Sequence, residues 1–197
     1  MITYIKGKYV EKNPAYVITE TAGGIGYHIH ISLTTFSDIK DLEDGILLTH
    51  FVVKEDGQSL YGFSSEEERT IFRQLIAVNG IGPNTALVFL SSLSITEITN
   101  AIMTENVRLL QSVKGVGAKT AQRVIIDLKD KIGKISSSSI SNKNSISYNN
   151  NKFEALSALS SLGFSKNSAE TVLDKIIGSE GINLSVEDLI KKALRLL

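Results

Sequence analysis

A short turn with two glycines occurs twice in this chain, and it restricts the possible folds more than any other feature. The two copies read N-G-I-G-P-N-T from Asn79 and K-G-V-G-A-K-T from Lys114, with a register of 35 residues between Gly80 and Gly115. Each copy follows an apolar segment with helical spacing and precedes another. The repetition predicts one unit used twice, in which a sharp turn joins two helices.

Each turn alone fits several structures. A nucleotide-binding loop of the form G-x-x-x-x-G-K-[ST] is excluded, because Val113 and Ala118 occupy its two glycine positions before Lys119. A dinucleotide-binding G-x-G-x-x-G turn follows a strand, whereas these turns follow helices, and threonine takes the place of its third glycine. A glycine that merely ends a helix would explain either copy by itself. The repeat favours a tandem helix-hairpin-helix.

A helix-hairpin-helix can bind a phosphate group through its backbone. The glycines let the chain turn sharply and approach a ligand closely, and the aliphatic residue between them, Ile81 or Val116, is expected to pack into the core. The next helix then offers free N–H groups at its N-terminus, where Pro83 suits the first helical position. Lys119 and Arg123 are four residues apart and share a helix face. Two such turns could hold a sugar–phosphate backbone without reading bases.

The remaining chain predicts an α+β multidomain protein. Residues 1–63 contain short alternating segments, and the Asp-Gly pair between two apolar runs predicts a hairpin with a type I′ turn, so we expect a small β-barrel. Residues 64–132 are helical in pattern and begin with a serine cap and acidic residues. Residues 133–151 are rich in Ser and Asn and predict a flexible linker. Residues 152–197 predict a three-helix bundle.

Composition limits the class of protein. The chain has 21 Lys and Arg against 21 Asp and Glu, and this neutrality argues at first sight against a nucleic-acid ligand. It has no cysteine, no signal-like start and no apolar run long enough to cross a membrane, so we expect a cytoplasmic protein. His28 and His30 could suggest a metal site, but no further acidic or histidine ligands stand at a suitable spacing. The acidic residues at 66–68 could suggest catalysis, but their position at the N-terminus of a predicted helix explains them. We identify no catalytic residue, metal site or cofactor.

Several motifs together resemble the RuvA family, whose members bind four-way Holliday junctions in bacteria. These are L-I-A-V-N-G-I-G-P, G-V-G-A-K-T-A-Q-R, L-Y-G-F at 60–63 and V-V-K-E-D-G. The resemblance implies an OB-fold barrel, the double hairpin domain and a mobile three-helix domain. It also implies a homotetramer or octamer, the RuvB motor ATPase and the RuvC resolvase as partners, and contact with the DNA backbone. The DNA-binding residues carried over are Asn79, Gly80, Gly82, Asn84, Thr85, Lys114, Gly115, Gly117, Lys119, Thr120 and Arg123.

The resemblance assigns two further groups of residues. Glu55 and Asp56 correspond to an acidic pin at the tetramer centre, where like charge would discourage a continuous duplex. Leu159, Leu162 and Phe164 lie at an S-L-G-F turn and are candidates for contact with the motor, although core residues of the bundle would have the same pattern. Members of the family often have basic residues where this chain has Asn84 and Ala118, which predicts weaker junction binding.

The sequence therefore favours a non-catalytic junction-binding subunit that recruits an ATP-driven motor for branch migration. A structure-specific, metal-dependent nuclease that uses the hairpins to grip DNA is the alternative from another class. Its carboxylate cluster would have to include Glu55 and Asp56. A pure protein-interaction scaffold is the third hypothesis.

Overall fold

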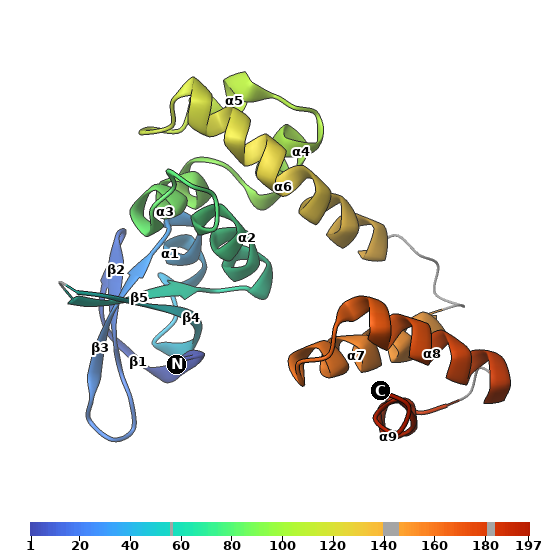
Figure 1. Ribbon diagram of the computed structural model, residues 1–197. Coiled ribbons are helices and arrows are strands. Elements are labelled where there is room, and N and C mark those ends of the chain that lie inside the picture. The colour runs from blue at the N-terminus through green and yellow to red at the C-terminus, as the bar shows by residue number, and fades with distance from the viewer. Residues whose placement is uncertain (56, 140–145, 181–183) are drawn as a thin grey trace. The chain divides into compact units, whose positions relative to one another are not determined.

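The computed structural model describes residues 1–55, 57–139, 146–180 and 184–197 (Figure 1). Contacts divide the chain into two compact units, Met1–Ile135 and Ser136–Leu197, which are described separately. The first unit contains both the β-barrel and the tandem hairpins, and the second contains three helices.

Five strands form a closed barrel in the order β1-β2-β3-β5-β4, with β4 pairing back onto β1. All neighbouring strands are antiparallel except β3 and β5. Helix α1 (Leu33–Ile39) connects β3 to β4, and this arrangement confirms the OB-like barrel. The strands are β1 (Tyr4–Asn13), β2 (Tyr16–Glu20), β3 (Gly26–Ile31), β4 (Asp44–Lys54) and β5 (Gly57–Phe63).

Alternation along each strand places one face in the barrel core. Val17, Ile29 and Leu47 have no exposed surface, and their neighbours in sequence point outward. Helix α1 was not anticipated from the sequence. Its signal is Ser32, whose side chain accepts a hydrogen bond from the Thr35 N–H and caps the helix.

The central helices form a hydrophobic core of their own, which also takes in the end of β5. Tyr61 and Phe63 of β5 lie in the same hydrophobic cluster as Phe72 and Phe89 of the helices. The barrel keeps a separate core that includes Leu60, so the border between the two cores lies within β5 rather than after residue 63. The helices are α2 (Glu66–Ile76), α3 (Pro83–Ser92), α4 (Ile95–Met103), α5 (Val107–Gln111) and α6 (Ala118–Ser139).

A buried carboxylate joins α2 to α1. The side chain of Glu68 accepts hydrogen bonds from the hydroxyls of Ser32 and Thr35, the latter at 2.6 Å. Burial raises the pKa of the Glu68 carboxyl, while the two hydroxyl donors act in the opposite direction. The next residue, Arg69, donates to the Thr3 carbonyl at 2.8 Å. The helix N-terminus thus explains Glu66 and Glu67, whereas Glu68 connects the helices to the barrel.

The predicted linker is shorter than its composition indicates. Helix α6 continues to Ser139 and α7 begins at Ile146, so most of residues 133–151 are helical, and residues 140–145 lie outside the described part. Extending a helix adds one hydrogen bond per residue, and Gly or Ser in its interior costs only about 1 kcal/mol or less. No proline follows Pro83 to stop it.

The second unit consists of α7 (Ile146–Ser161), α8 (Lys166–Glu180) and α9 (Val186–Ala193), as the sequence predicts. Its small core includes Leu156, Leu173 and Leu189. Among the described residues, no single helix is long and apolar enough to cross a membrane. In this described part, α3 and α4 have the length and apolar composition of a membrane span only when they are taken together. The chain bends by 101° between them.

Candidate nucleic-acid interface

The two glycine turns have the same local geometry. Gly80 and Gly115, the first glycine of each copy, have φ angles of +95° and +89°. Only glycine adopts this left-handed conformation without strain. In the first turn the Ile81 N–H donates to the Val78 carbonyl at 3.1 Å, and Val116 makes the equivalent bond to Val113 at the same distance. The repeat in sequence is therefore a repeat in structure.

The aliphatic residue of each turn packs inward as predicted. Ile81 and Val116 are both buried and belong to the core of the central helices. This packing leaves the second glycine of each turn on the outside, directly before the next helix.

Gly82 and Gly117 have a different role from the first glycines. Gly82 has φ −85° and ψ 168°, which any residue can adopt. A Cβ atom at Gly82 or Gly117 would meet nothing within 4 Å. Neither the fold nor the internal packing requires glycine at these positions. The space beside them is open to a ligand that approaches the backbone.

Both turns lead directly into helix N-termini. Gly82 is the N-cap of α3 and makes no side-chain hydrogen bond to it, and Pro83 occupies the first turn. The first N–H groups of any helix lack acceptors within the helix. Together with the helix dipole they form a site for an anion such as phosphate. The same applies to α6, which begins at Ala118 after Gly117.

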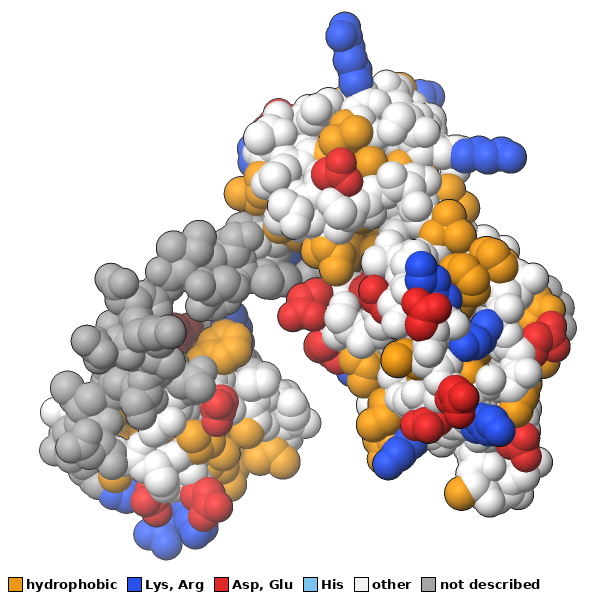
Figure 2. Space-filling view, turned by 180° about the vertical axis from the view of Figure 1, so that it is seen from behind, with side chains coloured by type: hydrophobic (Ala, Val, Ile, Leu, Met, Phe, Trp, Pro, Cys, Tyr) orange, Lys and Arg blue, Asp and Glu red, His pale blue; other side chains and the backbone are white. Residues whose placement is uncertain are grey.

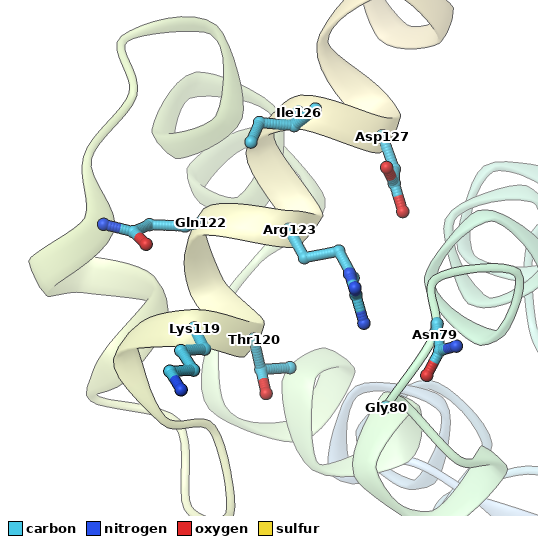
Figure 3. A pocket seen from close by; sticks show the side chains of 8 residues that line it. All are labelled: Asn79, Gly80, Lys119, Thr120, Gln122, Arg123, Ile126 and Asp127. Carbon is cyan, nitrogen blue, oxygen red and sulfur yellow. The ribbon is translucent and has the colours of Figure 1, made fainter.

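The two turns border one hollow of about 420 Å³, here called the hairpin hollow (Figure 3). The first turn contributes Asn79 and Gly80, and Thr120 Oγ1 lies 3.9 Å from the position of a Cβ on Gly80. Five predicted residues therefore meet here: Asn79, Gly80, Lys119, Thr120 and Arg123. The other predicted DNA contacts do not line it. Helix α6 contributes Lys119, Thr120, Gln122, Arg123, Ile126 and Asp127.

Three residues of the hollow were not identified from the sequence. Gln122 lies three positions after Lys119, and Ile126 and Asp127 lie three and four positions after Arg123. This helical spacing was the available signal. The side chain of Ile126 is 75% exposed. Figure 3 shows Arg123 and Asp127 on the side of α6 that faces the first turn.

The cations beside the turns form no ion pair with the residues that the structure describes. Lys114, Lys119 and Arg123 are exposed, and the ion pairs found among the described residues do not include them. By contrast, Lys129 on the same helix lies 2.5 Å from Glu105. Figure 2 shows cationic side chains extending outward from the helical region, while acidic and basic side chains are mixed over the barrel.

Comparison with known proteins agrees with this architecture. The family model described as "RuvA N terminal domain" matches residues 1–62, "SAM-like Helix-hairpin-helix tandem" matches 72–130, and "RuvA, C-terminal domain" matches 153–197. A protein of Christiangramia forsetii is 50% identical over 99% of both chains. One of Cytophaga hutchinsonii is 48% identical over the full length of both. One of Escherichia coli O9:H4 is 37% identical over 99% of this chain and 98% of its own.

The chain belongs to the RuvA family. All three relatives carry the name "Holliday junction branch migration complex subunit RuvA". The resemblance inferred from the motifs is therefore confirmed over the whole chain.

The acidic turn of this RuvA-family chain lies between two long paired strands. β4 and β5 pair from Leu48 with Phe63 to Lys54 with Gly57, and Glu55 directly follows the last paired residue of β4. We expected Asp56 and Gly57 at the centre of the turn. Gly57 instead belongs to β5 and pairs with Lys54. Glu55 is exposed, and Asp56 lies outside the described residues.

Asn84, one of the predicted DNA contacts, lies beside a residue of the barrel. Its side chain is exposed in the first turn of α3, and its Oδ1 lies 3.5 Å from the Tyr61 hydroxyl. Its neutral amide brings no positive charge to the start of α3. Thr85 next to it is half-buried.

The three candidate motor contacts have unequal access to a partner. Leu159 has no exposed surface and belongs to the core of its unit, which is the second of the two interpretations that its pattern allowed. Leu162 is 60% exposed, and Phe164 is half-buried against the core. Gly163 between them has φ +98° and ends α7, with hydrogen bonds from its N–H to Ser160 and from Phe164 to Leu159.

Proposed function

We propose that this chain binds four-way junction DNA through the sugar–phosphate backbone and acts as the non-catalytic DNA-binding subunit of a branch migration complex. The observation that carries the proposal is the pair of unobstructed glycines, Gly82 and Gly117, at helix N-termini. The cations beside them form no ion pair among the described residues. The names of the full-length relatives support it.

Each hairpin would hold one phosphate group. The N–H groups at the start of α3 or α6 would donate to its oxygens, and the helix dipole would favour its charge. Lys119 and Arg123 would add charge-assisted contacts at the second hairpin. Since these contacts reach only the backbone, the subunit would recognise the geometry of the junction rather than a base sequence.

Assembly would match the symmetry of the DNA. A homotetramer would give each of the four arms an equivalent set of hairpins, and closed rotational symmetry is the common form of such assemblies. Two tetramers could enclose one junction as an octamer. The assembly would act in the cytoplasm, where bacterial DNA lies, with the RuvB ATPase as motor and the RuvC resolvase as a further partner.

Glu55 and Asp56 would form the acidic pin of this assembly. The long β4–β5 pairing supports this proposal, because it holds the turn at the tip of a two-stranded hairpin. Carboxylates beside converging phosphates are repulsive, by about 1 kcal/mol per pair at ~4 Å in water. They would lower affinity for continuous duplex more than for separated strands, which increases specificity.

The second unit would recruit the motor. Leu162 and Phe164 are the candidate contacts, because both retain exposed surface at the end of α7. Leu159 would support them from the core. A fragment of residues 1–139 should then bind junctions but fail to stimulate the ATPase of RuvB. Loss of junction binding by this fragment would contradict the division of roles.

A salt titration tests the DNA-binding proposal. Junction and duplex affinities would be measured by fluorescence anisotropy across salt concentrations, since each lost phosphate contact lowers the slope of log K by roughly one. Lys119→Ala should lower the slope. Lys129→Ala is the matched control on the same helix, because Lys129 already pairs with Glu105. Equal slopes for the two variants, or no preference of the wild type for junctions, would contradict the proposal.

The same samples test the nuclease hypothesis. Among the described residues, no group of three His, Cys, Asp or Glu side chains is placed to hold a metal ion, so no observation favours cleavage. Junction DNA should remain intact after incubation with magnesium.

A further inference from the structure

The outer face of the barrel carries a row of aromatic rings that the proposed phosphate contacts do not use. Tyr16 of β2 stacks on His28 of β3, with ring centroids 4.6 Å apart and planes inclined by 24°. His28 contacts His30 edge to face at 5.0 Å, and His30 lies 5.5 Å from Tyr61 of β5. These four residues, here called the ring row, cross three neighbouring strands.

Strand alternation explains why the row lies outside the barrel core. Val17 and Ile29 point inward, so Tyr16, His28 and His30 point outward. His28 is exposed, Tyr16 and His30 are half-buried, and Tyr61 is covered by Phe72 at a centroid distance of 5.3 Å. The row therefore begins in solvent and ends in the packed core.

The exposed end of the row is held in place. The Tyr16 hydroxyl donates to Glu11 Oε1 at 2.5 Å, which fixes the ring that stacks on His28. Rings that are fixed before a ligand arrives lose little rotational freedom when it binds.

The row lies between the two proposed DNA-contacting regions. At one end, the Tyr61 hydroxyl is 3.5 Å from Asn84 Oδ1 in the first turn of α3. At the other, the parallel pairing of Ile29 with Leu60 brings the preceding residue, His28, beside Ser59. Ser59 is three to four residues from the acidic turn, or roughly 10–13 Å at 3.3 Å per residue. That distance corresponds to about three or four stacked nucleotides.

The chemistry of the row fits bases better than phosphates. Every base has a π-face that stacks on an aromatic ring, whatever its identity. Strands 2 and 3 and the β1–β2 and β4–β5 loops form the ligand face of OB barrels in general. Here Tyr16 begins β2 directly after the β1–β2 loop, and the β4–β5 loop is the acidic turn. The carboxylate of Glu11 beside Tyr16 would disfavour a phosphate at the row.

We propose that the ring row is a stacking site for unpaired bases of a DNA strand near the junction crossover. The inference rests on the proposed function, because the hairpins must first bring the DNA to this face. Branch migration exchanges base pairs at the crossover, so bases that are transiently unpaired would be available to stack.

The test compares two DNA probes on the full-length protein. One is a fully paired four-way junction. The other has a two-nucleotide unpaired gap at the crossover that contains 2-aminopurine, whose fluorescence falls when it stacks. The double variant Tyr16→Leu with His28→Leu removes the exposed rings but keeps apolar bulk. Tyr4→Leu is the control, because Tyr4 is 59% exposed on β1 and lies outside the row.

The wild type should bind the gapped junction and quench its fluorescence. The double variant should lose about tenfold in affinity for that probe, the loss typical of one stacking ring, and should restore the fluorescence. Its affinity for the fully paired junction should stay within about twofold. Tyr16→Phe, which keeps the ring and loses only the bond to Glu11, should retain most of the quenching.

Three results would overturn the inference. Equal quenching by the wild type and the double variant would show that bases do not stack on the row. A change in oligomeric mass of the double variant by light scattering, with quenching retained, would assign this face to a second copy of the chain. Failure of the wild type to bind the fully paired junction would refute the proposed function itself.

Discussion

The same substitution at the first and at the second glycine of one turn should affect two different properties of the protein. Gly80 has φ +95°, whereas Gly82 has φ −85° and open space where a Cβ would lie. Gly80→Ala and Gly82→Ala add the same methyl group two residues apart. We expect the first change to reduce stability and the second to reduce DNA affinity.

The structure gives magnitudes for both changes. A Cβ on Gly80 would lie 3.9 Å from Thr120 Oγ1, an ordinary contact, so the cost is the left-handed conformation alone, about 1–2 kcal/mol. At Gly82, alanine reduces the entropy of the unfolded chain, which stabilises the protein by about 0.4–1 kcal/mol. Alanine is also a poorer N-cap than glycine, and this offsets the gain, so the net change in stability should stay within ~0.5 kcal/mol. The new methyl would displace a phosphate from a charge-assisted hydrogen bond worth about 1.5–3 kcal/mol, or roughly 10- to 150-fold in affinity.

Urea denaturation and junction binding by fluorescence anisotropy would measure the two effects on the same samples. Gly115→Ala and Gly117→Ala repeat the comparison in the second hairpin. Wild-type junction affinity in both Gly82→Ala and Gly117→Ala would refute the phosphate assignment. A loss of more than about 1 kcal/mol of stability in either would show that the space beside the second glycines is not open.

Three other predictions concern the buried carboxylate of Glu68, the second unit and the acidic turn. Glu68→Ala should cost about 1–3 kcal/mol, because it leaves the hydroxyls of Ser32 and Thr35 without their acceptor, and Glu68→Gln should cost less. Since the folded pKa of Glu68 is raised, its contribution to stability should fall as pH rises above the ordinary 4.5, and urea titrations of Glu68→Gln should lack this slope. Gly163→Ala should destabilise α7 by about 1–2 kcal/mol because of φ +98°, seen as faster hydrogen exchange in the second unit and unchanged exchange in the first. Glu55→Gln with Asp56→Asn should tighten duplex binding more than junction binding, and an unchanged ratio across salt would make this turn an ordinary solvated loop.

Local rules predicted the elements of the fold better than their boundaries. The glycine repeat, the inward Ile81 and Val116 and the barrel strands follow from period and turn chemistry, because each depends on nearby residues. The end of α6 did not follow, since Ser and Asn bias a chain against helix by only a few tenths of a kcal/mol each. The place of Gly57 in β5 did not follow either, because pairs such as Leu48 with Phe63 fix the register far from the turn.

The site was predictable as a set of residues but not as a surface. The motif identifies Lys119, Thr120 and Arg123, yet their meeting with Asn79 depends on how the two hairpins pack. Glu68 shows the same limit. Its position in the first turn of α2 is explained locally by the helix dipole, while its burial depends on α1, 33 to 36 residues earlier in the chain.

Neutral composition was the observation that pointed away from DNA, and the structure shows why net charge is a poor guide here. Affinity for a backbone depends on cations that are free to meet phosphate, not on the sum over the chain. Arg69 and Lys129 are satisfied by Glu66 and Glu105. Lys114, Lys119 and Arg123 have no ion pair in the described chain and stand beside the helix N-termini.

Much of the attraction for phosphate would then come from backbone N–H groups, which release no counterions of their own. Salt dependence per subunit should therefore correspond to about three phosphates, the number of these free cations, at a slope near 0.9 each. A steeper slope would mean that cations outside the hairpins also contact DNA.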